Sequence, residues 1–345
     1  MQRQTYFKII TLTIAIAFGC LLAEIGYRIF HYLTFHNLEE ISSDSRPAVN
    51  EPETEKKMGQ VIQLSSNPKI IYEFIPNSIY KFKNVMVSIN EDGFRDKNYP
   101  SPKGTRTKRV IGLGDSVMFG WGVEEEDAYL SQLENNLNDS DTLKYEVINT
   151  AVPGYNTVME LATFKNKIKV DEVDLVIINF VGNDYDLPNF IRKRPDYLGI
   201  KKSMILQLFE KTDGFDKRLR YAPFDDVNRR MERNPEKVPA EYRDMIGEAA
   251  CINALTELSQ LASQNDFRII FLNHSAVLDV PPNMADFIKN DSSYILLELK
   301  PYWNEYQKQN PEAEWKLSED DWHPSVEYHH LIGKVLEKVI TEKLD

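Results

Sequence analysis

Residues 109–120, Arg-Val-Ile-Gly-Leu-Gly-Asp-Ser-Val-Met-Phe-Gly, join a short apolar run to a Gly-Asp-Ser turn and then to a second apolar segment. Short β-branched runs that are bounded by glycine and polar residues are typical of buried strands. Ser116 therefore lies where a strand ends and a helix begins. A serine hydroxyl at such a turn is a candidate nucleophile if a base lies close to it.

The same alternation of strands and helices continues along the chain. Strands are predicted at Val110–Leu113, Tyr145–Asn149, Leu175–Phe180 and Arg268–Leu272, and helices at about 126–138, 156–168, 242–264 and 325–342. The strands are nearly continuous in apolar residues, which favours a parallel sheet that is covered on both faces. The pattern predicts an α/β fold, a three-layer α/β/α sandwich with a mostly parallel sheet.

Three polar turns follow three of these strands. They contain Gly-Asp-Ser116, Gly154 and Gly182-Asn183. In open α/β sheets, sites form at the carboxyl ends of the strands. We therefore expect these three turns to lie together at one edge of the sheet.

A candidate base lies near the C-terminus, in Asp320-Asp321-Trp322-His323-Pro324. A neutral imidazole is the usual base for serine near pH 7, and a carboxylate is needed to fix its tautomer. Asp320 and Asp321 are both candidates for that carboxylate. We expect Asp320, three residues before His323, to fold back onto Nδ1, and Asp321 to point elsewhere.

A tetrahedral intermediate also needs donors for its oxyanion. The backbone N–H groups of Ser116 and Gly154 and the side-chain amide of Asn183 are candidates. Each motif alone has a simpler explanation, because Asp115-Ser116 also fits a helix N-cap and Gly182-Asn183-Asp184 also fits an ordinary turn. All the motifs together, in this order and at the ends of predicted elements, favour the catalytic interpretation.

These motifs resemble the four signature blocks of the SGNH (GDSL) hydrolase superfamily. The resemblance covers about residues 108–343 and rests on Gly114-Asp115-Ser116, Gly154, Gly182-Asn183-Asp184 and Asp320-x-x-His323-Pro324. It implies a flavodoxin-like three-layer fold and ester hydrolysis. The N-terminal apolar segment and the run Asn90-x-x-Gly-Phe-Arg95 resemble membrane-tethered bacterial members.

The resemblance also implies a role for each site residue. Ser116 would be the nucleophile, His323 the base and Asp320 its partner. Ser116, Gly154 and Asn183 would form the oxyanion hole. Asp321 is a departure from the pattern, since many members carry glycine there, and it leaves a second carboxylate beside His323.

The N-terminus carries an apolar segment without charge from Ile9 to Ala23, with apolar character through Phe30. These residues, about 22 in all, are enough to cross a hydrocarbon core of about 30 Å. Basic residues precede the segment and acidic residues follow it, so the positive-inside rule places the N-terminus in the cytoplasm. The catalytic domain would then be extracytoplasmic, in a periplasm or at the cell surface.

Two other interpretations of this segment are a cleaved signal peptide and a lipoprotein signal at Cys20. No convincing small-x-small cleavage site follows the apolar run, which favours an uncleaved anchor. Phe18 in the sequence Ala17-Phe-Gly-Cys20 argues against the lipoprotein signal, and a cysteine within a membrane helix is the preferred explanation of Cys20.

Three segments are expected from this organisation. Residues 1–35 form the cytoplasmic N-terminus and anchor, residues 36–68 a polar stalk, and residues 69–345 the hydrolase domain with lead-in strands at its start. Residues about 186–241 interrupt the alternation with a stretch of mixed charge. This insertion is either a helical segment near the mouth of the site or a solvated insert.

Composition excludes some functions. The net charge of −12 over 345 residues argues against nucleic-acid binding, which needs a basic face. Two cysteines, Cys20 and Cys251, do not make a disulfide framework. Metal-ligand spacing is absent, and the Gly112-x-Gly114 pair lacks the rest of a dinucleotide fingerprint, so neither a metal nor a cofactor is predicted. The sequence does not determine the oligomeric state.

The sequence thus predicts a membrane-anchored serine esterase. Its substrate would be a small-molecule or carbohydrate ester, with cell-surface carbohydrate as a candidate. One alternative is an O-acyltransferase that passes the acyl group to a polysaccharide with the same residues. The other is a glycan-binding protein on the same fold without catalytic activity.

Overall fold

A five-stranded parallel sheet forms the centre of the computed structural model. Its strands are β6 (Thr107–Leu113), β7 (Lys144–Asn149), β8 (Leu175–Phe180), β9 (Arg268–Asn273) and β10 (Tyr294–Glu298), and their order is β10-β9-β8-β6-β7. Counted in chain order within the sheet, this is the flavodoxin-like order 2-1-3-4-5. The predicted fold class is therefore confirmed.

The structure describes residues 2–39, 49–139, 143–187, 203, 205, 233–238, 240–276 and 279–343. Most of the insertion predicted at 186–241 lies outside these residues.

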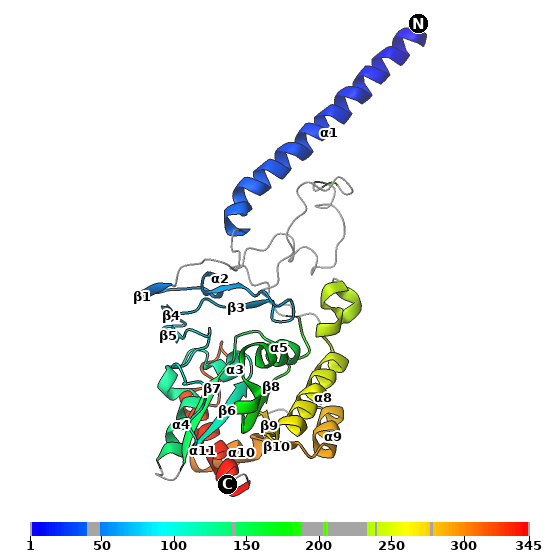
Figure 1. The fold of residues 1–345 in the computed structure, drawn as a ribbon. Helices are drawn as coiled ribbons and strands as arrows, with labels where there is room; N and C mark the ends of the chain where they lie inside the picture. The colour runs from blue at the N-terminus through cyan, green and yellow to red at the C-terminus, as the bar shows by residue number, and fades with distance from the viewer. Residues whose placement is uncertain are drawn as a thin grey trace.

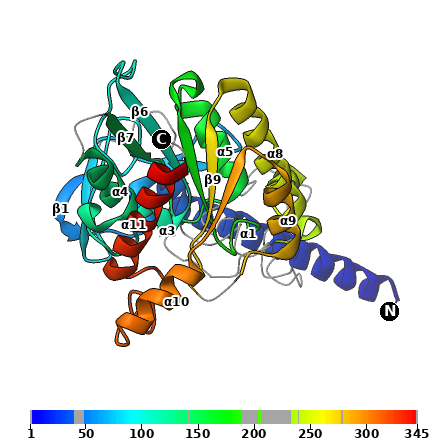
Figure 2. The same ribbon diagram turned by 90° about the horizontal axis from the view of Figure 1, so that it is seen from below.

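Helices cover both faces of the sheet. On one face lie α4 (Tyr129–Asn138) and α11 (Val326–Lys343), and on the other lie α5 (Thr157–Lys167) and α8 (Glu248–Asn265) (Figure 2). Along β8, alternate side chains enter two different hydrophobic cores. Leu175 and Ile177 belong to the first core, and Val176 and Ile178 belong to the second. This period of two on a fully apolar strand is what a sheet buried on both faces requires.

The remaining short helices complete the body of the fold. They are α3 (Ser116–Phe119), α9 (Pro282–Asn290) and α10 (Lys300–Gln309), with short 3-10 turns η1 (Glu125–Asp127), η2 (Val170–Glu172), η3 (Pro235–Lys237) and η4 (Ala240–Met245). The elements α9, β10 and α10 are not among those predicted from the sequence. The segment of β10, Tyr-Ile-Leu-Leu-Glu, is short and only partly buried, so it lacks the continuous apolar signal of the other strands.

Residues 50–99 form a lead-in that packs against the end of the main sheet. Its elements are β1 (Asn50–Glu55), α2 (Met58–Val61), β2 (Ile62–Leu64), β3 (Tyr72–Phe74), β4 (Ser78–Phe82) and β5 (Val85–Ile89). They form a three-stranded sheet β1-β4-β5 and a two-stranded sheet β2-β3, which lie between α1 and the main sheet (Figure 1).

Part of the lead-in falls within the range expected to be a polar stalk, residues 36–68. The structure differs from this expectation, since residues 50–64 form the regular elements β1, α2 and β2. Val61 and Ile62 are fully buried, and β1 pairs with β4. A short apolar run in an otherwise polar segment is enough to dock that segment on a neighbouring core, which average composition does not show.

The N-terminal helix α1 (Gln2–Glu39) projects away from the rest of the fold (Figure 1). Its segment Gln4–Phe30 is exposed and is long and apolar enough to cross a membrane, a property that a signal sequence shares. Near the end of this segment, Arg28 Nε lies 2.7 Å from Glu24 Oε1. This i,i+4 ion pair places two charges side by side on one face of the helix.

Candidate active site

Ser116 is the first residue of α3, directly after the turn that ends β6. Asp115 caps this short helix, since its Oδ1 accepts a hydrogen bond from the N–H of Val117 at 3.0 Å. The turn is tight, because a Cβ on Gly114 would lie 2.7 Å from the Cβ of Met118. Glycine at 114 therefore lets the chain reverse and present the Ser116 hydroxyl at the carboxyl edge of the sheet.

His323 meets Ser116 at this edge. The loop before α11 carries His323, and its Nε2 lies 2.8 Å from Ser116 Oγ. The two residues are 207 positions apart in the sequence, and both are buried. This distance is within hydrogen-bonding range, so the imidazole is placed to accept the hydroxyl proton.

The carboxylate that meets His323 belongs to Asp321. Its Oδ1 lies 2.5 Å from His323 Nδ1 and also accepts the backbone N–H of His323 at 3.2 Å. This arrangement is an Asx turn, in which an aspartate side chain bonds the backbone two residues on. Asp320, the expected partner, is exposed to solvent. The pairing is therefore corrected from Asp320 to Asp321, because the local turn brings the nearer carboxylate to the ring.

Two tryptophans pack on His323, and sequence analysis missed both. Trp121 stacks on the imidazole at 4.7 Å between centroids with 14° between planes, and Trp322 at 4.4 Å and 19°. Two indoles cannot share one face of a five-membered ring, so they lie on opposite faces. Trp322 is adjacent to His323 in the sequence, and this adjacency is the only sequence feature that could have indicated either contact.

The loop with Gly154 also reaches the turn that carries Ser116. The N–H of Val152 donates to the carbonyl of Gly114 at 3.2 Å, and the N–H of Tyr155 donates to the carbonyl of Val152 at 3.1 Å. Pro153 and Gly154 are the central residues of this turn, and Gly154 has φ 80°. A type II turn needs positive φ at this position, so glycine is favoured there.

Asn183 is tied to the same turn from the end of β8. Its Nδ2 donates to Asp115 Oδ2 at 2.9 Å. A carboxamide nitrogen carries two hydrogens, so one remains for another acceptor. The structure thus brings Ser116, His323 and Asn183 together around Asp115, and it links the Gly154 loop to the adjoining Gly114.

Burial is the largest influence on the pKa of each ionisable group at this site. Burial lowers the pKa of His323, although the hydrogen bond and charge of Asp321 oppose the shift. For Asp321, burial acts to raise the pKa, but the hydrogen bonds and charge of His323 and the hydrogen bond from Trp121 together outweigh burial, and the pKa is lowered. Burial raises the pKa of Asp115, opposed by the hydrogen bond from Asn183. A neutral imidazole beside an ionised Asp321 is the state that a general base needs.

Two further buried carboxyl groups, Glu160 on α5 and Asp184, lie close enough to Asp115 to interact electrostatically with it. Burial raises the pKa of each well above its ordinary value, and each also feels the charge of a neighbouring carboxyl group. Asp184 Oδ2 accepts the N–H of Val181 at 2.6 Å and so closes the turn that carries Asn183.

The other histidines have structural contacts. Nδ1 of the fully buried His329 accepts the N–H of Tyr129 at 3.2 Å and so caps α4. His330 Nε2 lies 3.0 Å from Asp127 Oδ1. His274 is buried, its ring centroid is 6.4 Å from that of Trp322, and burial lowers its pKa to about 4.

Within the described part of the chain, no group of three or more acidic, histidine or cysteine side chains is placed to hold a metal ion.

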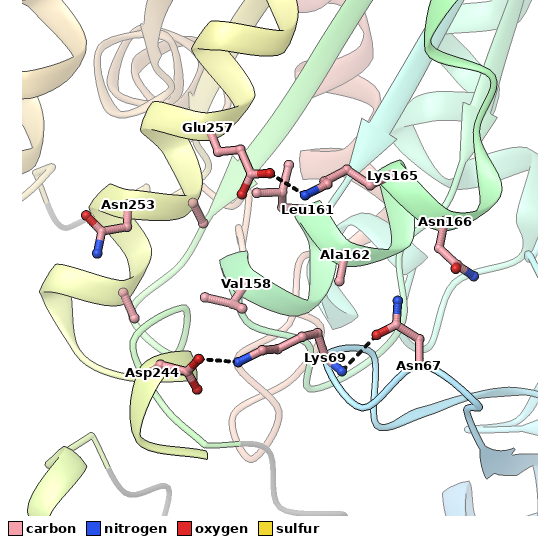
Figure 3. A pocket seen from close by; sticks show the side chains of 12 residues that line it. Asn67, Lys69, Val158, Leu161, Ala162, Lys165, Asn166, Asp244, Asn253 and Glu257 are labelled. Atoms are coloured by element: carbon pink, nitrogen blue, oxygen red, sulfur yellow. Dashed lines mark hydrogen bonds and ion pairs between the residues drawn. The ribbon is translucent and has the colours of Figure 1, made fainter. Parts of the chain in front are cut away.

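An open groove of about 390 Å³ lies elsewhere, between α5 and α8. Two ion pairs, Lys165 with Glu257 and Lys69 with Asp244, cross this part of the surface (Figure 3). Its lining comes from α5, α8, the lead-in and the segment before α8, and it does not include Ser116 or His323. The groove is therefore separate from the candidate active site.

A serine and a histidine that meet at the carboxyl edge of a flavodoxin-like sheet define a hydrolase-like arrangement. The model of the GDSL-like lipase/acylhydrolase family matches residues 110–336, and the chain belongs to this family. The family predicted from the motifs is thereby confirmed, and the protein is an enzyme that acts on ester bonds.

Solved structures with similar folds include TesA, the acetyl xylan esterase AlAXEase, and Axe2, an acetylxylan esterase from Geobacillus stearothermophilus. Each is 13% identical to the chain, with TM-scores of 0.40, 0.41 and 0.39. They cover 68%, 67% and 68% of this chain and 99%, 99% and 94% of their own. No curated protein matches the chain.

Proposed function

We propose that Ser116, His323 and Asp321 form the catalytic triad of a serine esterase. The observation that carries the proposal is the continuous chain of contacts, 2.8 Å from Ser116 Oγ to His323 Nε2 and 2.5 Å from His323 Nδ1 to Asp321 Oδ1. The nucleophile follows the first strand of the sheet, beside the point where the strand order reverses, which is where ligands bind in such folds.

The reaction follows from this geometry. Ser116 Oγ attacks the ester carbonyl carbon while its proton passes to His323 Nε2. The tetrahedral intermediate collapses, the bond to the alcohol oxygen breaks, and the imidazolium returns the proton to the leaving alcohol. A water molecule then attacks the acyl-serine with His323 again as base, which releases the acid and restores the Ser116 hydroxyl.

Oxyanion stabilisation is assigned to the backbone N–H groups of Ser116 and Gly154 and to the Asn183 amide. Asp115 has a supporting part in this arrangement, because it holds one amide hydrogen of Asn183 and thereby orients the other. Preorganised donors of this kind need no rearrangement when charge develops on the substrate oxygen.

The test of the triad is the Ser116→Ala variant of the full-length protein. It should lose turnover of short-chain p-nitrophenyl esters and labelling by a fluorophosphonate probe, while Ser131→Ala, on α4, retains both. Peptide mapping of the labelled wild type should place the probe on Ser116. Wild-type turnover in Ser116→Ala would remove Ser116 as the nucleophile, and absence of labelling in the wild type would favour a catalytically silent protein.

We further propose that the ester is carried by a carbohydrate. Trp322 supports this, because its side chain stacks on His323 and is nevertheless 48% exposed. A large exposed aromatic ring beside the proposed base is a natural packing surface for a ring-shaped substrate. Trp322→Ala should raise KM for an acetylated oligosaccharide more than for p-nitrophenyl acetate, and equal effects on the two would contradict the proposal.

Hydrolysis and transfer to a glycan can be separated in one reaction. With an acetyl donor and an unacetylated oligosaccharide present together, we expect free acetate to be the main product. A predominance of acetylated oligosaccharide would instead identify an O-acyltransferase that uses the same residues.

We also propose that α1 is an uncleaved membrane anchor with the catalytic domain on the extracytoplasmic side. The apolar length of Gln4–Phe30 supports spanning, and Arg3 and Lys8, before the uncharged run that begins at Ile9, support a cytoplasmic N-terminus. The protein isolated from cells should retain its N-terminal residues by sequencing and should leave the membrane only with detergent. A mature chain that begins after Phe30 would identify a signal peptide.

A further inference from the structure

Trp121 is presented by an unusual turn directly after α3. Gly120 and Gly122, on either side, have φ 83° and 74°. A Cβ on Gly122 would lie 2.5 Å from Leu317 Cδ2, so the turn packs closely against the loop that leads to His323. Glycine on both sides of Trp121 allows the conformation and this close approach.

The indole of Trp121 contacts two members of the proposed triad. Its Nε1 donates to Asp321 Oδ2 at 3.2 Å, and its ring stacks on His323. Asp321 Oδ1 is already taken by His323, so Trp121 holds the second oxygen of the same carboxylate. The carboxylate is thereby fixed at both oxygens.

The lead-in holds the turn that carries Trp121. Arg95 is buried, and its guanidinium donates to the carbonyls of Gly120 at 2.7 Å and Val123 at 2.8 Å, one on each side of the tryptophan. At the tip of the β4–β5 hairpin, Phe82 meets the indole edge to face at 4.9 Å. Lys83 Nζ lies over the same ring, 4.9 Å from its centroid.

The lead-in also holds the loop with Gly154. The buried Tyr72, on β3, donates its hydroxyl to the carbonyl of Pro153 at 2.8 Å. The hydroxyl of Tyr155 donates in return to the carbonyl of Tyr72. Two side-chain hydrogen bonds in opposite directions therefore fix this loop against β3.

We propose that the lead-in, which precedes the segment matched by the family model, is part of the catalytic unit: it positions the Asp321–His323 pair through Trp121 and the Gly154 loop through Tyr72. Trp121 and Tyr72 are then positioning residues. This inference rests on the proposed triad. Its physical basis is that a catalytic geometry is maintained only when the supporting side chains are themselves fixed by packing and hydrogen bonds.

The lead-in also places the charge of Lys83 near His323. Burial lowers the pKa of His323, the Asp321 and Asp115 carboxylates raise it, and the Lys83 ammonium lowers it. The neighbouring imidazoles of His274 and His329 also interact electrostatically with His323. Removal of the Lys83 charge should therefore raise the kinetic pKa of the base.

The experiment uses the full-length protein in detergent and three pairs of variants. Trp121→Phe keeps an aromatic ring but removes the hydrogen bond to Asp321, and Trp303→Phe, at a buried tryptophan of α10, is its control. Tyr72→Phe removes the hydroxyl that reaches Pro153. Its control is Tyr80→Phe, on β4, because the Tyr80 hydroxyl has no hydrogen-bond partner among the residues described. Lys83→Gln is matched by Lys81→Gln in the same hairpin.

We expect Trp121→Phe to lower kcat by about ten- to a hundredfold, the effect of losing one hydrogen bond to a charged group, with little change in KM. Tyr72→Phe should lower kcat by about three- to tenfold, as for a neutral hydrogen bond. Lys83→Gln should move the acid limb of the kcat/KM profile to higher pH. The three controls should keep wild-type kcat, KM and pH dependence.

The outcomes separate this inference from the function on which it rests. If Ser116→Ala is inactive while Trp121→Phe, Tyr72→Phe and Lys83→Gln behave as wild type, the inference fails and the triad stands. Equal losses in the variants and their controls would show general packing and would also overturn it. Activity in Ser116→Ala would overturn both.

Discussion

Asp321 Oδ1 meets His323 twice, 3.2 Å from its backbone nitrogen and 2.5 Å from Nδ1 of its ring. One short turn thus fixes the backbone of the loop and the orientation of the imidazole together. The tautomer with a proton on Nδ1 leaves Nε2 free to accept from Ser116, which is the form that a general base requires.

This relationship predicts a clear difference between two adjacent aspartates. Asp321→Asn should lower kcat by about 10³- to 10⁴-fold, because an amide at this position favours the wrong imidazole tautomer. Asp320→Asn, at the neighbouring exposed position, should keep wild-type kcat. Steady-state kinetics with p-nitrophenyl acetate checks both. The reverse ranking would restore Asp320 as the partner of His323.

The pH dependence of the rate follows from the burial of His323. Burial lowers the pKa of His323, and the proposed mechanism uses the neutral imidazole as the base. The value of kcat/KM should therefore rise with pH through a midpoint below the ordinary value of about 6.5 and stay constant above it. Initial rates between pH 4 and 9 give this midpoint. A midpoint above the ordinary value would contradict the assignment of this ring as the base.

The Asn183 amide should contribute to the transition state more than to substrate binding. Asn183→Ala should lower kcat by about 10²- to 10³-fold, the usual effect of losing one oxyanion donor, and should leave KM nearly unchanged. Asn166→Ala, an exposed position on α5, serves as the control. A change confined to KM would show that Asn183 binds the ground state and does not act as an oxyanion donor.

Glu160 should destabilise the protein at neutral pH. Burial raises its pKa, so the folded state binds the proton more tightly than the unfolded state, and stability falls as pH rises above about 4.3. Glu160→Gln removes the free-energy cost of a buried carboxylate at neutral pH, because a neutral amide replaces the acid.

The apparent Tm of Glu160→Gln should exceed that of the wild type at pH 8 by about 3 °C or more, as expected for ~1 kcal/mol in a domain of this size. The difference should shrink towards pH 4, where the Glu160 carboxyl of the wild type is mostly protonated in both the folded and the unfolded state. The exposed Glu91→Gln variant should show no such trend. A pH-independent difference would mean that packing, and not ionisation, causes the change.

Much of the fold is readable in the local sequence. β8 was predicted with its observed boundaries, and the predicted β7 and β9 differ from the observed strands by one residue. Strands buried on both faces carry a continuous apolar signal, and the glycines and polar residues that follow them mark where each strand must end. The edge of the sheet where Ser116, Gly154 and Asn183 lie follows from strand direction alone, since parallel strands end on the same side.

The sequence by itself thus determined the layered α/β architecture, the candidate nucleophile and its base, because these depend on periodicity and on short motifs. Tertiary structure decided which aspartate faces His323, that Trp121 holds that aspartate, and that the lead-in packs behind both. Trp121 and Asp321 are 200 residues apart, and their contact exists only because two loops pack together at one sheet edge. No local pattern encodes a contact between loops so distant in the chain, because it depends on the packing of all the elements between them.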